Sequence, residues 1–312
     1  GRVFLGSRMS SKEHGKLLFP DVSVVMPVHD MPMTLVRRAL RSVHRQDYAG
    51  VIETILWDDG SRNPYRRDAY AALESWPDSA SVPAGHRVVA AHRTQEQRGI
   101  ARSRNDAVAR AGAQWLLWLD GDDELPSDAI SSLVAAVARS ENPYAIGQCR
   151  VVYPWGVSEV HSNVPYLNAW RRQRASQDDP LAHVVFNTHG GLVRRDLFRR
   201  TGGFDPRFSH AKLVDWFRRL FRALPATDAF DILSTVTYVH HKRSGSQSSD
   251  RARVVPQRIE ALQRYASAAG MPPAELDAPI VNVATGCPEY KRVEREPDSA
   301  GGELVDVEPA RP

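Results

Sequence analysis

The chain has 312 residues, of which 42% are hydrophobic and 25% are charged, the composition of an ordinary globular protein long enough to bury a large core. Its formal net charge of +4 is too small to indicate a nucleic-acid-binding protein, although it favours anionic ligands. The two cysteines, Cys149 and Cys287, lie far apart and show no zinc-binding spacing, so we expect a reduced, cytoplasmic protein without disulfides.

Neither end of the sequence predicts packed structure. Residues 1–20 lack the apolar core of a signal peptide and are interpreted as a loosely docked arm, whose basic side chains leave peripheral membrane contact open. Residues 285–312 are rich in Gly, Pro and Glu, which predicts an extended tail. No apolar run approaches the ~20 residues that cross a bilayer, so no transmembrane segment is expected. A homodimer is left open.

Residues 21–143 alternate short apolar runs with helix-like segments. Strands are predicted at 22–26, 51–57, 87–91 and 115–119, and helices at 32–43, 64–76, 100–111 and 127–138. Pro27 is expected to end the first strand, and Ser127 is expected to cap the last of these helices. The alternation predicts an α/β fold with a Rossmann-like, mostly parallel sheet and helices on both faces.

The alternation weakens after residue 144. Strands are predicted at 145–153, 190–193 and 232–239, helices at 213–224 and 254–269, and a polar, arginine-rich segment at 165–177. No clean linker separates the two parts. We therefore expect one continuous domain, residues 21–284, in which residues 144–284 add a smaller lobe of mixed strands.

Polar and charged residues follow each predicted strand of the first half. The strand ends carry PVHD, DDGS, HRTQEQRG and DGDDE in chain order. Ligands of such sheets bind beyond the carboxyl ends of the strands, where these four segments meet. The sequence therefore predicts a functional site at this edge of the sheet.

Two acidic segments stand out among the strand ends. Asp120 and Asp122, separated by Gly121, follow the buried run WLLWL, and hard carboxylate oxygens at such a place suit Mg²⁺ or Mn²⁺ bound together with substrate phosphates. The next two acids, Asp123 and Glu124, also suit a helix N-terminus. In the segment TILWDDGS, Asp58 and Asp59 are either turn residues or acceptors for a nucleobase or a ribose hydroxyl.

Five segments in this order resemble the family 2 glycosyltransferases, which have the GT-A fold. They are VSVVMPVHD, TILWDDGS, RGIARSRNDAVARAGAQWLLWLDGDD, GGLVRRDLFRRTGGFD and LVDWFRRL, spread over about residues 20–250. The resemblance implies metal-dependent transfer of a sugar, with inversion, from a UDP-, GDP- or TDP-sugar to an acceptor hydroxyl. The acceptor would be a natural product or an envelope glycan or lipid. Residues 21–143 would bind the nucleotide sugar, and residues 144–284 the acceptor.

The resemblance also implies a role for each residue that matches a motif. The donor-side residues would be Pro27 and His29 beside the nucleobase, Asp58 or Asp59 holding it, Arg104 near the base or diphosphate, and Asp120 on the ribose or sugar. Asp122 would bind the Mn²⁺ or Mg²⁺ ion. Asp215 would be the general base that takes the proton from the acceptor hydroxyl.

The later segment TYVHHKRSGSQSS offers further candidates. By the same resemblance His241, or its neighbour His240, would complete the metal shell, and Lys242 and Arg243 would meet phosphate oxygens, although a solvated basic loop is an equal alternative.

Other candidates belong to the acceptor side. His189 is a weaker candidate for lining the acceptor cleft. Three aromatic side chains could stack on sugar faces or belong to the core: Trp155, Tyr166 and Trp170.

The sequence departs from the family pattern at three positions. His29 replaces a Tyr, Ala101 replaces a Ser, and Val214 replaces the Glu that precedes the general base. The loss of that acid leaves an alternative open, namely a catalytically inactive protein that binds sugar nucleotides or glycans. A sugar-phosphate nucleotidyltransferase ranks lower, because PVHDMPM offers no glycine-rich basic loop after the first strand.

Overall fold

The computed structural model describes residues 19–75, 86–162, 189–208, 212–224 and 229–243, with a few short pieces after them. The main sheet contains the strands β1 Val22–Val28, β2 Ile52–Asp58, β3 His86–Arg93, β4 Trp115–Trp118, β5 Tyr144–Val152, β6 Ser158–His161, β7 Gly191–Arg194 and β8 Asp231–His241. The helices are α2 Met33–His44, α3 Pro64–Ala71, η1 Ala72–Ser75 (a 3₁₀ helix), α4 Ile100–Arg110, α5 Ala129–Ser140, α7 Arg195–Arg200 and α8 Lys212–Ala223. A second, two-stranded sheet pairs β9 Ile280–Asn282 with β10 Cys287–Glu289 in antiparallel orientation.

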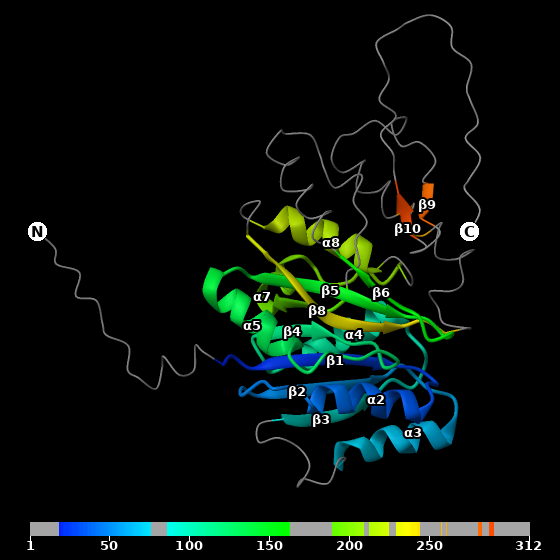
Figure 1. The fold of residues 1–312 in the computed structure, drawn as a ribbon. Coiled ribbons are helices and arrows are strands. Elements are labelled where there is room, and N and C mark those ends of the chain that lie inside the picture. The colour runs from blue at the N-terminus through cyan, green and yellow to red at the C-terminus, as the bar shows by residue number, and fades with distance from the viewer. Residues whose placement is uncertain are drawn as a thin grey trace, which may run out of the picture.

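One mixed sheet carries both halves of the chain (Figure 1). Its order is β3-β2-β1-β4-β7-β5-β6, with β8 paired to β5. The strands of the first half, β1 to β4, pair in parallel, whereas β7 runs antiparallel to both β4 and β5. The predicted α/β fold is thus confirmed, and the second half extends the first sheet through β7.

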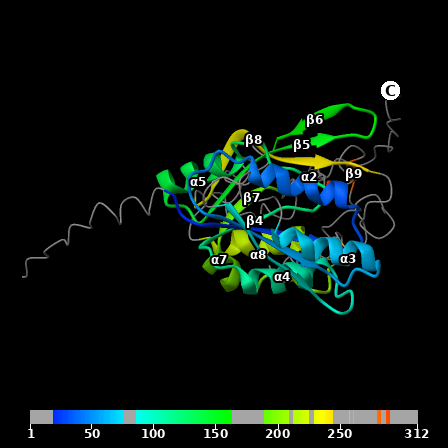
Figure 2. The same ribbon diagram turned by 90° about the horizontal axis from the view of Figure 1, so that it is seen from below.

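Helices cover both faces of the sheet (Figure 2). On one face, α2 and α5 pack with the alternate β1 residues Val24 and Met26 in one apolar cluster. On the other face, α4, α7 and α8 pack with Val25 of β1 in a second cluster. The strand is therefore buried on both sides, as a central parallel strand must be.

Two predicted boundaries are wrong. Pro27 does not end β1 but lies inside it, in register with Trp57 of β2. The pairing of β1 with β4 ends at Val25. Beyond that residue, no N–H of β1 has to donate to β4, so a proline, which has no N–H, is tolerated at position 27. Ser127 does not cap α5 either, because the helix begins only at Ala129, after a turn in which Ala129 N donates to Pro126 O.

Several predicted segments fall outside the described residues. These are the arm up to residue 18, the segment 165–177, nearly all of 254–269 and most of 285–312. Cys149 is buried and is not in a disulfide. In the described part of the chain, no helix combines the length and apolarity needed to cross a membrane.

Candidate active site

The carboxyl ends of β1, β2 and β4 meet at one edge of the sheet, as predicted. The end of β8 joins them there, although it lies more than a hundred residues further along the chain. Glu124 N donates to Val239 O at 3.0 Å, and Val239 N donates to Glu124 O at 2.9 Å. This bridge places the DGDDE segment beside the end of β8 and so brings the two predicted metal-binding segments together.

Asp58 and Asp59, which the sequence could not tell apart, make different contacts. Asp58 holds its own turn, because its Oδ1 accepts from Ser61 N at 2.9 Å and from Ser61 Oγ at 2.5 Å. Asp59 spans to the loop before α4, where its two oxygens accept from Arg98 N and Gly99 N, both at 2.9 Å. Both carboxylates are buried. Each carboxylate therefore holds a loop at the end of β2 in place. A direct contact of either one with a nucleobase stays a prediction.

The end of β1 is tied to the end of β2. His29 lies within 2.8 Å of the Asp59 carbonyl oxygen through Nδ1. Asp30, which the sequence did not single out, has a φ of 44° and accepts from Arg62 N and Asn63 N. These contacts place Pro27 and His29 beside the DDGS turn, where they are predicted to border a base.

Arg104 and Asp120, predicted to be neighbours at the donor side, form an ion pair through Arg104 Nη2 and Asp120 Oδ1. The Arg104 side chain is buried, and its guanidinium carbon lies 5.6 Å from the centre of the Phe204 ring. Two further nitrogens of this guanidinium, Nε and Nη1, are buried without a hydrogen-bond acceptor in the described residues. Buried cationic donors of this kind suit an anionic or carbonyl-bearing ligand.

Each acid that follows Gly121 has a cationic or hydrogen-bonding partner of its own. Asp122 Oδ2 accepts from Arg243 Nε at 2.6 Å. The buried Asp123 accepts from Tyr238 OH at 2.8 Å, His240 Nδ1 at 3.0 Å and His241 N at 2.8 Å. Gly121 is required here, because a Cβ at this position would lie 2.8 Å from Val28 Cγ1.

The last acid, Glu124, contacts a histidine and an arginine. His241 Nε2 lies 2.8 Å from its Oε1, and Arg38 Nε lies 3.3 Å from the same atom. Arg38 also donates to the Asp122 carbonyl oxygen. Sequence reasoning missed Arg38, a residue of α2 that contacts both Asp122 and Glu124.

The structure divides the two predicted metal ligands between different partners. His241 contacts Glu124 and Asp122 contacts Arg243, and among the described residues no three His, Cys, Asp or Glu side chains gather in a metal-binding arrangement. Burial raises the pKa of the Asp122 carboxyl, the charges of Asp123 and Asp120 raise it further, and Arg243 lowers it. A cation that shares Asp122 with substrate phosphates would relieve this repulsion, so Asp122 fits a magnesium-like ion. A metal role for His241 stays a prediction.

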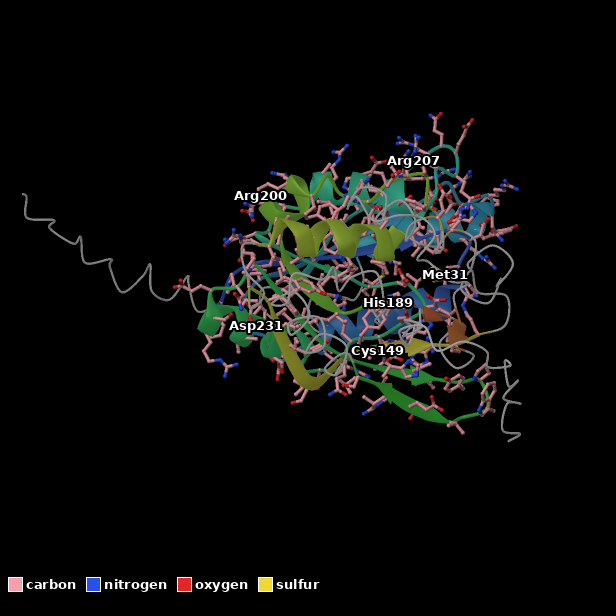
Figure 3. All side chains as sticks on the ribbon, turned by 90° about the horizontal axis from the view of Figure 1, so that it is seen from above. Met31, Cys149, His189, Arg200, Arg207 and Asp231 are labelled. Atoms are coloured by element: carbon pink, nitrogen blue, oxygen red, sulfur yellow. The ribbon has the colours of Figure 1, made fainter. Side chains whose placement is uncertain are left out.

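His189, which is labelled in Figure 3, makes more contacts with the site than its sequence suggested. Its ring stacks on Tyr238, with centroids 5.2 Å apart, and on His240, with centroids 5.6 Å apart and planes within 3°. Burial lowers the pKa of His189 to about 4, from an ordinary value of 6.5. The imidazole is therefore neutral at pH 7.

The low pKa of His189 predicts that the protein loses stability in weak acid. Because the unfolded chain protonates His189 below pH 6.5 and the folded chain only below about pH 4, stability falls as the pH drops through this window. We expect the free energy of unfolding to fall by about 2 kcal/mol between pH 7 and pH 5, because His189 is protonated in the unfolded chain but not in the folded one. His189→Phe keeps an aromatic stack without the titration, so urea unfolding at the two pH values should show a smaller loss in the variant. Equal losses in both proteins would contradict the assignment.

Asp215, the predicted general base, lies in the first turn of α8. Its Oδ2 accepts from Arg219 Nη2 at 2.6 Å and from Arg219 Nε at 3.2 Å. The next residue, Trp216, packs its ring against Trp118, the last residue of β4, and against Phe204, over which Arg104 lies. The aromatic cluster thus anchors the start of α8 on the strand that leads to Asp120.

Of the three aromatic candidates for sugar stacking, the structure describes only Trp155. This residue follows β5 and is 71% exposed, with its ring stacked on Tyr153 at 4.9 Å. Lys242 N donates to Val152 O at 2.8 Å, which places this stacked pair beside the end of β8. Tyr166 and Trp170 lie outside the described residues.

The sequence matches the model of a known family over more than half of its length. That family, Glycosyl transferase family 2, matches residues 23–202. The O-antigen biosynthesis protein RfbC of Myxococcus xanthus is 25% identical over 202 residues, covering 61% of this chain and 15% of the relative. An N-acetylglucosaminyltransferase of Bradyrhizobium elkanii is 26% identical over 142 residues, covering 46% of this chain and 73% of the relative.

Solved structures share the fold at low sequence identity. The structure of S. aureus TarS 1–349 in complex with UDP-GlcNAc matches with a TM-score of 0.56 and 16% identity, covering 79% of this chain and 73% of that one. The structure with UDP matches with a TM-score of 0.52 and 14% identity, covering 79% of this chain and 72% of that one.

This chain spans less than a third of the length of the first two curated relatives. It covers 15% of the Myxococcus xanthus protein and 31% of an N-acetylglucosaminyltransferase of Neorhizobium galegae.

Proposed function

The chain belongs to glycosyl transferase family 2, and we propose that it transfers a sugar, with inversion, from a nucleoside-diphosphate sugar to an acceptor hydroxyl. The observation that carries the proposal is the row of charged groups where β1, β2 and β4 end. There the buried cation Arg104 pairs with Asp120, two residues before Asp122. A site that offers both fixed cations and carboxylates suits a ligand with a diphosphate and a sugar.

The donor that we propose is UDP-N-acetylglucosamine. Two of the curated relatives are named N-acetylglucosaminyltransferases, and TarS has been solved with UDP and with UDP-GlcNAc. His29 and the buried nitrogens of Arg104 provide polar groups that could hold a uracil or the diphosphate. GDP- and TDP-sugars are the competing donors.

The transfer would divide the chemistry between three carboxylates. Asp122 would hold Mn²⁺ or Mg²⁺, which supplies positive charge against the leaving diphosphate. Asp120, oriented by Arg104, would contact the ribose or the sugar. Both bonds from Arg219 end on Asp215 Oδ2, so Oδ1 is the oxygen that would accept the proton of the acceptor hydroxyl. That hydroxyl oxygen then bonds to the anomeric carbon as the bond to the diphosphate oxygen breaks.

We propose an envelope glycan as the acceptor, ahead of a natural product or a lipid. One curated relative is named an O-antigen biosynthesis protein, which supports this class. The exposed ring of Trp155, beside the end of β8, offers an apolar face of the kind on which sugar rings stack.

Titration calorimetry of UDP, GDP and TDP with and without Mn²⁺ tests the proposed function. We expect UDP to bind tightest, with a dissociation constant in the micromolar range that weakens about tenfold or more without the metal. A preference for GDP or TDP would replace the donor. If none of the three nucleotides binds, the chain is not a nucleotide-sugar transferase.

One observation favours the second candidate, a protein that binds sugar nucleotides without turnover. Asp215 is held by Arg219, and Val214 stands where the family pattern has a Glu. Such a protein would bind UDP but would release none from UDP-N-acetylglucosamine in the presence of any acceptor.

A further inference from the structure

We propose that Arg243 neutralises Asp122 when the site is empty and moves to the diphosphate when a nucleotide binds, so that the metal ion and the nucleotide enter together. The inference rests on the proposed function, because it assumes a diphosphate ligand. It concerns the order in which the ligands bind, which the proposed chemistry leaves open.

The first observation is that, among the three acids of the DGDDE segment that pair with an arginine, Asp122 has the most exposed partner. The Arg243 side chain is 39% exposed, against 1% for Arg104 on Asp120 and 33% for Arg38 on Glu124. Asp122 itself is only 15% exposed. A partly exposed guanidinium gains little from a carboxylate that it shares with water, so of these three pairs the Asp122–Arg243 pair is the easiest to exchange.

The second observation is that the main chain leading to Arg243 is fixed. His241 N donates to Asp123 Oδ1, and Lys242 N donates to Val152 O, both at 2.8 Å. Arg243 is the next residue, so its side chain can change partner by rotating about its own bonds while the strand end stays in place. The exchange therefore needs no rearrangement of β8.

The third observation is that Asp122 is fixed as well. Arg38 holds its carbonyl oxygen, and Gly121 packs tightly against Val28 and Met31. A guanidinium binds phosphate oxygens through two parallel hydrogen bonds, more strongly than it binds one carboxylate oxygen through Nε. Once a diphosphate draws Arg243 away, Asp122 keeps its position and becomes available to the metal.

Arg243 would then couple the two ligands. Without a nucleotide it competes with the metal ion for Asp122, and with a nucleotide it contributes to binding the diphosphate. Because coupling between two sites is reciprocal, metal and nucleotide should each raise the affinity for the other. Removal of the guanidinium should therefore change the two affinities in opposite directions.

The test measures binding by calorimetry in the wild type, in Arg243→Gln and in a control, Arg200→Gln. Arg200 is a 61% exposed arginine of α7, at the periphery of the molecule in Figure 3. We expect Arg243→Gln to bind Mn²⁺ alone about tenfold more tightly than the wild type, and to bind UDP in saturating Mn²⁺ about tenfold more weakly. Arg200→Gln should leave both values unchanged. Arg243→Lys, which keeps the charge but cannot form two parallel bonds, should give intermediate values.

Either of two results would overturn the proposal. One is an unchanged affinity of Arg243→Gln for Mn²⁺ alone, and the other is an unchanged affinity for UDP with Mn²⁺. Thermal unfolding of each variant shows whether a lost affinity reflects lost folding, and in that case the values for Arg243→Lys decide. If the wild type binds none of UDP, GDP and TDP, the proposed function fails, whatever the Mn²⁺ titrations show.

Discussion

Replacement of Asp122 by asparagine should abolish the effect of Mn²⁺ on UDP binding and reduce sugar transfer about a thousandfold. The amide keeps the size and shape of the side chain but removes the charge that would hold the ion. A thousandfold loss corresponds to about 4 kcal/mol, the scale on which a metal ion stabilises a leaving group. Calorimetry of UDP with and without Mn²⁺, together with UDP release from UDP-N-acetylglucosamine, measures both effects.

A matched control for Asp122→Asn is Asp196→Asn. Asp196 also pairs with an arginine, Arg194, but it is exposed and lies at the start of α7. This variant should bind UDP as the wild type does, with the same response to Mn²⁺. If Asp122→Asn retains the full response to Mn²⁺, then Asp122 does not hold the metal, and another residue at this edge must be sought.

The first half of the fold could be predicted from the sequence because its signals are local. A buried strand such as β1 reads as a short apolar run, and α2 shows Val36, Ala39, Leu40 and Val43 at helical spacing on its buried face. Parallel strands joined by helices also place their carboxyl ends together. The charged segments could therefore be assigned to one edge of the sheet before any contact was known.

The contacts within the site could not be predicted, because they depend on pairings between distant segments. Asp58 and Asp59 are adjacent in sequence and equivalent in pattern, yet one binds Ser61 and the other binds the loop before α4. Tyr238 was predicted only as part of the strand at 232–239, although its hydroxyl links Asp120 N to Asp123. Only Thr237 and Tyr238 are buried in β8, and nothing in the sequence pattern of this strand indicated the link.

The distribution of partners explains why a run of acids is tolerated at the end of a buried strand. Asp123 is buried but receives three hydrogen bonds, so it serves to attach β8 to the site. Asp120 and Asp122 receive arginines whose exposure differs widely. The buried partner, Arg104, orients Asp120, whereas the partly exposed partner, Arg243, is the one that we propose to exchange and so to leave Asp122 open to a ligand. On this proposal, the same motif combines a structural carboxylate, Asp123, with a ligand-binding one, Asp122.

Replacement of Asp215 by asparagine should reduce sugar transfer about a thousandfold and leave UDP binding unchanged. A positioned general base contributes about 10²- to 10⁴-fold to a rate, and an asparagine cannot take the proton of the acceptor hydroxyl. UDP binding should be unaffected, because Asp215 is proposed to contact the acceptor hydroxyl and not the nucleotide, and it pairs with Arg219 of its own helix. The rate of UDP release from UDP-N-acetylglucosamine, with water or an added sugar as acceptor, and the affinity for UDP measure the two effects separately.

The ion pair with Arg219 must be separated from catalysis, because Asp215→Asn weakens both. Arg219→Gln provides the control, since it removes the cation that pairs with Asp215 and keeps the carboxylate. Because Asp215 is buried and Arg219 is partly buried, thermal unfolding of both variants shows how much of a lost rate reflects lost stability. Slow transfer only in Asp215→Asn would identify the base. If Asp215→Asn instead transfers sugar within about tenfold of the wild type, below the usual range for a general base, another group must take the proton.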